Sequence, residues 1–132
     1  MQFSGIDYIA VLAAAAAGFA TGAVWYTVLG KAWLAALGKT REELGSSPAP
    51  FVVAIVADIV MAWMLAGILG HLGEATIRSG VISAFFLWLG FVITTMAVNH
   101  AFGGARRMLT LIDGGHWLAV LLVMGLVLGA FG

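Results

Sequence analysis

The segment PAPFVVAIVADIVMAWMLAGILGHL, residues 48–72, decides the fold. It contains one acidic residue, Asp58, and its other side chains are almost all apolar. An α-helix of about 20 apolar residues crosses the hydrocarbon core of a bilayer. The segment is long enough for this, and it lacks the alternation with period two that a strand of a membrane barrel needs. It therefore predicts a transmembrane helix.

Three more apolar segments of this length are present, at residues 6–29, 77–102 and 106–131. Together the four segments predict an all-α fold, a polytopic membrane protein built as a bundle of four transmembrane helices. Short connections between the later spans leave no room for a second domain, so residues 1–132 are expected to form a single membrane domain.

The composition leads to the same class of protein. Hydrophobic residues make up 63% of the chain and charged residues only 9%, whereas a soluble domain has roughly 25% charged residues. The net charge is zero, so no nucleic-acid partner is expected, and membrane lipids are the expected surroundings. Cysteine is absent, which excludes disulfides and thiolate metal ligands. The first Lys or Arg is Lys31, so the N-terminal apolar run reads as a first span and not as a signal peptide.

Helix-capping signals mark the starts of the spans. Ser4 and Asp7 have the spacing of a capping box before the first span, and Thr76 precedes the third. The longest connection, residues 30–47, has Trp33 on the apolar face of a short helical pattern. We expect a short interfacial helix here, with Trp33 at headgroup depth, and an ordinary polar loop is the alternative.

Basic residues predict the orientation of the chain. Five of the six lie in the first and third connections, residues 30–47 and 103–107: Lys31, Lys39, Arg41, Arg106 and Arg107. The connection between the second and third spans has only Arg78 at its edge. The positive-inside rule therefore places the first and third connections in the cytoplasm and both termini outside.

Polar residues within the spans collect at one depth. An ionisable group at the centre of a membrane helix costs roughly 2.5–3.5 kcal/mol, so it is expected to have a partner or a wet cavity. At the helical rise, Asp58 lies about 10 Å in from Phe51, and Asp113 and His116 lie about 8 and 12 Å in from Met108. All belong to the cytoplasmic leaflet. The predicted polar pocket comprises Trp25, Tyr26, Lys31, Trp33, Asp58, Asn99, His100, Asp113 and His116.

These polar residues also have structural interpretations. Asp58 is a candidate acceptor for Tyr26, Trp25 or Lys31. Asp113 and His116 share a helix face, and the two glycines between them either interrupt the helix, as in many transporters, or permit tight packing.

Small residues at helical spacing predict close helix packing. Gly18 and Gly22 form a small-xxx-small pattern that Ala14 extends, and Gly125 and Gly129 form another. Packing within the chain is the main interpretation, and a homo-oligomer face is the alternative.

No metal, cofactor or catalytic residue is predicted. His100 lies about 5 Å from Gly103, and His116 lies about 12 Å from Met108, a difference in depth that disfavours two-histidine haem ligation. No serine lies in a strand-to-helix elbow, and no metal-ligand motif is present.

Two strings carry a resemblance to a known family. GAVWY at residues 22–26, then LGKAW at 29–33 and Gly38, resemble the opening signature of a bacterial family of small four-helix membrane proteins of unknown function, DUF1761. The resemblance implies the four-span architecture and a bacterial cytoplasmic (inner) membrane, and it implies no established activity.

The resemblance continues along the chain. Asn99 with Phe102 looks like the third-helix signature of the family, and residues 111–113 with Gly115 look like the fourth. The family has tyrosine where this chain has His116, which weakens a metal-ligand role for that residue. The positions that the resemblance singles out are Trp25, Tyr26, Lys31, Trp33, Asn99 and Asp113.

The leading functional hypothesis is a non-enzymatic membrane protein that binds or conducts a small solute or a proton in the polar pocket. Asp58 and Asp113 would carry the charge. One alternative is a scaffold or interaction subunit of a membrane complex that uses the glycine faces. Another is a small membrane enzyme acting on a lipid or quinone head group, with Asp113 and His116 as an acid–base pair.

Overall fold

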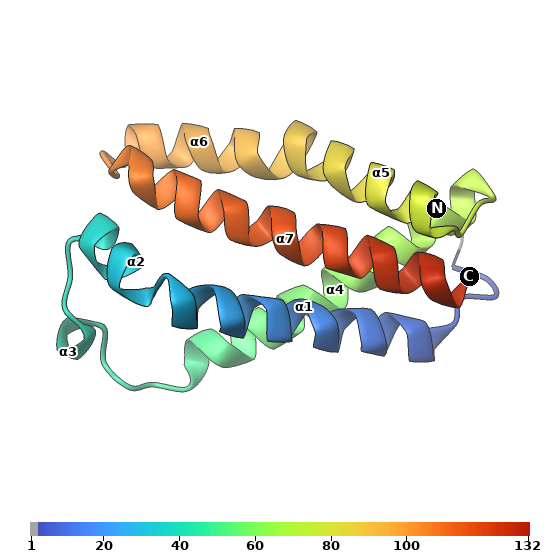
Figure 1. Ribbon diagram of the computed structural model, residues 1–132, viewed down its shortest axis with the longest axis horizontal. Coiled ribbons are helices and arrows are strands. Elements are labelled where there is room, and N and C mark those ends of the chain that lie inside the picture. The colour runs from blue at the N-terminus through green and yellow to red at the C-terminus, as the bar shows by residue number, and fades with distance from the viewer. Residues whose placement is uncertain (1–2) are drawn as a thin grey trace.

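The computed structural model describes residues 3–132, and Figure 1 shows an all-helical bundle. Four helices are long and apolar enough to cross a membrane: Tyr8–Val28 (α1), Ala49–Leu72 (α4), Ile77–Phe102 and Arg107–Phe131 (α7). No strand occurs in this described part of the chain. The prediction of an all-α protein with four membrane spans is confirmed, and the observed ends lie within two residues of the expected ones.

The third span is not one regular helix. It consists of α5 (Ile77–Leu87), a π-helical turn (Trp88–Val92) and α6 (Ile93–Phe102). A π-helical turn shifts the side chains that follow it around the helix axis, and such turns are frequent at functional sites. The apolar pattern of this span did not predict the turn.

Two short helices fill the connection between α1 and α4. They are α2 (Gly30–Leu37), which follows α1 after Leu29 alone, and α3 (Arg41–Leu44). Thr40 and Glu43 form a capping box at the start of α3. The predicted short helix is therefore present. Its Trp33 packs against a cluster of three buried residues, Ala36, Leu109 and Ile112.

The cap of the first span differs from the expectation. Asp7 is the N-cap, because its carboxyl oxygen accepts hydrogen bonds from the amides of Ile9 and Ala10 at 3.0 and 3.2 Å. Ser4 lies too early in the chain to reach these amides, so the prediction that Ser4 caps the helix was wrong. Thr76 caps α5 as expected, with its hydroxyl accepting from the amide of Ser79.

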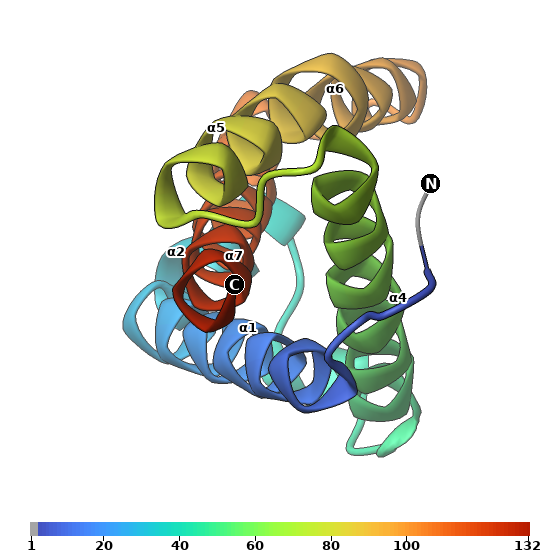
Figure 2. The ribbon, with the colours of Figure 1, turned by 90° about the vertical axis from the view of Figure 1, so that its right-hand side faces the viewer.

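The helix α7 occupies the centre of the bundle. In Figure 1 it lies between α1 on one side and α5 and α6 on the other. The helix α4 packs on α1 and comes beside α5 only where the two are connected, as the end-on view in Figure 2 shows. At the opposite end of the bundle, α4 and α6 are far apart in both views.

Glycines allow α5 and α7 to meet backbone against backbone. A Cβ atom placed on Gly125 would collide with the carbonyl group of Gly80, and one on Gly129 would collide with the carbonyl group of Thr76. Close approach of this kind is the use that membrane helices make of small-xxx-small patterns. These glycines therefore pack within the chain.

The glycines of α1 also face α7. A Cβ on Gly18 would stand 2.6 Å from the Met124 methyl group, and one on Gly22 would stand 2.8 Å from His116 Nε2. Ala14, on the same face, is fully buried. The small residues of α1 thus make room for long side chains of α7.

The two ends of the bundle differ in charge. The start of α1 and the end of α7 lie at one end of the bundle in Figure 1, which we call the terminal end. The other end holds the connections at residues 29–48 and 103–106 together with five of the six Lys and Arg residues, and we call it the basic end.

Candidate functional site

Tyr26 is the centre of a polar and aromatic cluster between α1, α2 and α7. Its hydroxyl donates a hydrogen bond to Asp113 Oδ1 at 2.6 Å. Its ring lies edge-on to Trp33, with centroids 5.5 Å apart, and 4.9 Å from the ring of His116. We call Tyr26, Trp33, Asp113 and His116 the tyrosine cluster. It joins residues that lie 87 positions apart in the chain.

Two tryptophans bind the backbone of α7 beside this cluster. Trp25 of α1 donates from Nε1 to the carbonyl oxygen of Ile112 at 3.0 Å, and Trp88 of the π-helical turn donates to that of Gly114 at 2.8 Å. The ring of Trp25 lies 2.9 Å from where a Cβ on Gly115 would stand. Because α7 is unbroken, the paired glycines here accommodate neighbouring side chains and do not interrupt the helix.

The contribution of Trp88 was missed in the sequence. A buried indole N–H needs an acceptor, so a tryptophan in mid-span is a signal for a hydrogen bond to a neighbouring helix. The sequence does not name the acceptor, since both this contact and the π-helical turn depend on how α5 packs on α7.

Asp58 stands apart from the hydrogen bonds of the tyrosine cluster and of the two tryptophans, because no described residue donates to its carboxyl group. It is the one buried charged residue among residues 3–132, with 4% of its surface exposed. Two of the expected donors have other acceptors, because Tyr26 donates to Asp113 and Trp25 donates to the carbonyl oxygen of Ile112. The third, Lys31, is exposed on α2. Within the described residues, no side chain donates a hydrogen bond to the Asp58 carboxyl group.

A cavity of about 390 Å³ connects Asp58 with the tyrosine cluster. It lies between α1, α4 and α7 in the half of the bundle toward the basic end. Its lining includes Tyr26 and His116 from the cluster, Asp58 from α4, Arg41 from α3 and the ring of Trp117. Polar groups from four helices therefore border one space.

Six of the nine predicted pocket residues do not line this cavity. Trp33 and Asp113 contact Tyr26 within the tyrosine cluster, and Trp25 binds the backbone of α7 beside it. The other three lie elsewhere. Asn99 is exposed on α6, and Lys31 is exposed on α2. His100 pairs with a residue that the sequence did not single out, because its Nδ1 lies 2.8 Å from Thr110 Oγ1. The physical reason is the central position of α7, which lies between α6 and α1. The nine predicted residues therefore do not form one pocket.

His116 lies within the cluster but lacks the expected partner. Its ring lies tilted against that of Tyr26 and edge-on to that of Trp117, with centroids 4.9 and 4.5 Å away. Its Nδ1 atom is buried, and no described group forms a hydrogen bond with it. Asp113 bonds Tyr26 and not His116, so the acid–base pair of the enzyme hypothesis is absent from the described hydrogen bonds.

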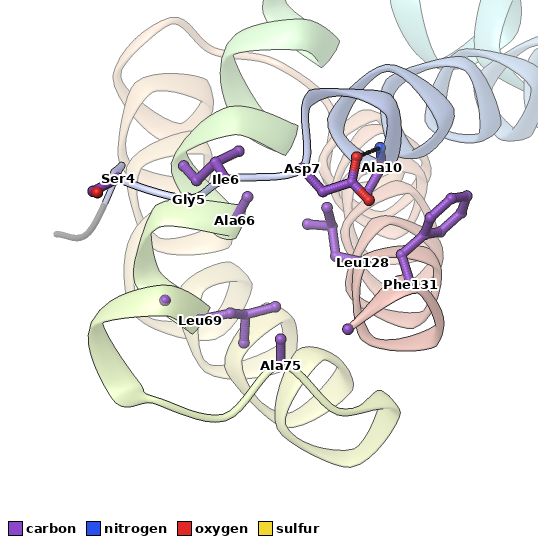
Figure 3. Close-up of a pocket in the computed structure, with 12 residues that line it drawn as sticks. Ser4, Gly5, Ile6, Asp7, Ala10, Ala66, Leu69, Ala75, Leu128 and Phe131 are labelled. Atoms are coloured by element: carbon purple, nitrogen blue, oxygen red, sulfur yellow. Dashed lines mark hydrogen bonds between the residues drawn. The ribbon is translucent and has the colours of Figure 1, made fainter.

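A second cavity, of about 300 Å³, lies at the terminal end between the starts and ends of the spans (Figure 3). Asp7 is the only side chain with a charge among the described residues that line it, and it caps α1, as the dashed hydrogen bond to Ala10 shows. Most of the other labelled side chains are apolar or small. The carboxyl group in the lining of this cavity therefore already accepts hydrogen bonds, unlike that of Asp58.

Metal binding finds no support in the geometry. Among residues 3–132, no three His, Asp or Glu side chains come close enough together to hold a metal ion. At the basic end, the guanidinium group of Arg106 donates a hydrogen bond to the carbonyl oxygen of Ala35 in α2. This bond connects the start of α7 with α2.

These features define a small four-span membrane protein whose helices border a cavity lined by the buried residue Asp58, to which no described side chain donates a hydrogen bond. Residues 9–129 match the model of a family described as "Protein of unknown function (DUF1761)". The chain belongs to this family, and the resemblance predicted from its sequence is confirmed. No curated protein and no solved structure matches the chain.

Proposed function

We propose that the protein binds a small solute in the cavity between α1, α4 and α7, with Asp58 as the principal contact. The observation that carries this proposal is that Asp58 is a buried residue beside a cavity, and that its carboxyl group has no donor among the described residues. A buried polar group without a partner costs free energy. A solute with a hydrogen-bond donor or a positive charge would supply the missing partner.

The lining of the cavity supports the same proposal. Its volume of about 390 Å³ falls in the range of small-molecule sites, which is roughly 300–1,000 Å³. The hydroxyl group of Tyr26 donates a hydrogen bond to Asp113. Its oxygen therefore still has a lone pair that can accept a hydrogen bond from the solute. Asp113 would thus act as a positioning residue for Tyr26. Trp117 and Phe51 supply apolar walls.

The test is native mass spectrometry of the protein extracted with its own lipids into nanodiscs. We expect the wild-type protein to carry a bound molecule whose occupancy falls at least tenfold in Asp58→Asn, because the amide keeps the volume and loses the charge. Glu42→Gln is the matched control, since it removes an exposed carboxyl group that does not line the cavity. An empty wild-type protein, or full occupancy in Asp58→Asn, would overturn the proposal.

We further propose that the basic end faces the cytoplasm of a bacterial inner membrane, which places the cavity in the cytoplasmic half. The support is the gathering of five of the six Lys and Arg residues at that end. The chain has no cysteine, so single cysteines report orientation cleanly. In intact cells, an impermeant maleimide should label Glu74→Cys and should label Ser46→Cys only after lysis. The reverse pattern would show that the basic end lies outside.

A further inference from the structure

A second space adjoins Asp58 on the seam between α1 and α4. It has a volume of about 290 Å³, and Asp58 is the only polar residue among the described residues that line it: Leu12, Ala15, Ala16, Phe19, Ile55, Asp58 and Ile59. Asp58 and Phe19 line this space and also the larger cavity described above. We call the 290 Å³ space the apolar groove. Asp58 thus lies between the larger cavity and the apolar groove.

The apolar groove is open to the surroundings of the bundle. Leu12 from α1 and Ile55 and Ile59 from α4 border it, and they are 59%, 45% and 38% exposed. These residues lie within membrane spans, so the medium that they meet is the acyl chains of lipids. A molecule in the bilayer would therefore reach Asp58 from the side, between α1 and α4, without passing through water.

We infer that the solute bound at Asp58 is a single-chain amphiphile with an ammonium head group, which enters from the bilayer and leaves its alkyl chain in the apolar groove. This inference rests on the proposed function and adds the class of ligand. An apolar groove whose lining contains one carboxyl group matches an alkyl chain that ends in one positive charge. An anionic head would be repelled by Asp58.

The other groups around the larger cavity are compatible with an ammonium head. Trp117 and Tyr26 line the cavity, and aromatic faces attract ammonium groups. The cation in the lining, Arg41, has its Nη2 atom 3.6 Å from where a Cβ on Gly30 would stand. Its guanidinium group therefore lies by the junction of α1 and α2, where it complements the C-terminal end of α1.

The experiment compares two probes, decylammonium and ethylammonium, which share the head group and differ in the chain. Binding to the full chain in phosphatidylcholine nanodiscs is followed by tryptophan fluorescence at constant ionic strength. Each affinity is expressed relative to that of the wild-type protein for the same probe, so the partitioning of decylammonium into the bilayer cancels. We expect Asp58→Asn to weaken both probes at least tenfold.

The variant Ala16→Phe tests the binding of the alkyl chain separately from the binding of the head group. Ala16 is exposed and lines the apolar groove, so a phenyl ring at this position would occupy the space for the alkyl chain without disturbing the core. We expect it to weaken decylammonium about tenfold and to leave ethylammonium unchanged. Ala20→Phe is the matched control, because Ala20 is also exposed on α1 but lines neither space.

The outcomes distinguish the two proposals. If Asp58→Asn weakens both probes but Ala16→Phe has no effect on decylammonium, a solute binds at Asp58 and the amphiphile inference is wrong. If Ala20→Phe weakens decylammonium as much as Ala16→Phe does, the groove is not the site of the chain and the inference also fails. If neither probe depends on Asp58, both proposals fall.

Discussion

Replacing Gly125 with valine is expected to lower the free energy of unfolding by about 3 kcal/mol, because overpacking a close helix contact forces the backbones apart. Gly125 of α7 meets the carbonyl group of Gly80 in α5 directly. A clash with a side chain can be relieved by rotation, whereas a clash with backbone moves a whole helix. The same displacement would pull Trp88 away from the carbonyl oxygen of Gly114.

The measurement is equilibrium unfolding in mixed micelles, followed by tryptophan fluorescence. Gly90→Val is the control, since Gly90 lies in the neighbouring third span and a Cβ there would have no neighbour within 4 Å. It carries the same change in chain entropy and side-chain size. Equal stability of the two variants would contradict the direct packing of α5 on α7.

Replacing Tyr26 with phenylalanine is expected to cost about 2 kcal/mol, in the range for a hydrogen bond to a carboxyl group. The hydroxyl is the one described side-chain donor to Asp113, at 2.6 Å. Its loss leaves the Asp113 carboxyl group partly buried and without that donor. The aromatic contacts to Trp33 and His116 are kept, because the ring remains.

A double-mutant cycle isolates this hydrogen bond from other effects of the substitution. Tyr26→Phe is compared in the wild-type chain and in Asp113→Asn by the same unfolding measurement. We expect the cost of removing the hydroxyl to fall by more than 1 kcal/mol in the second background, since a neutral amide needs the donor less. Identical costs in both backgrounds would mean that the two residues do not interact energetically.

Depth along the membrane could be predicted from the sequence. Composition and length located the four spans, and the constant rise of a helix placed Asp58, Asp113 and His116 in the same half of the bundle. Capping residues such as Thr76 were also recognisable, because a cap bonds to its own helix within three residues.

Direction around each helix axis could not be predicted in the same way. Asn99 and His100 have a suitable depth, but neither lines the cavity, and α7 lies between their helix and α1. A span that is apolar on all sides has no stripe to show which face meets which neighbour. For the same reason, the sequence could not decide between Asp58 and Asp113 as the acceptor for Tyr26, and the structure assigns Asp113.

The central place of α7 has a consequence for biosynthesis. Ribosomes make the chain from its N-terminus, so α1, α4 and the third span all leave the ribosome before the helix on which α1 and α5 pack. Until then, the small-residue faces around Gly18 and Gly80 have no α7 to cover them. The contacts of α1 and α5 with α7 can therefore form only after the last span has been made, whereas α1 and α4 can pack together before it.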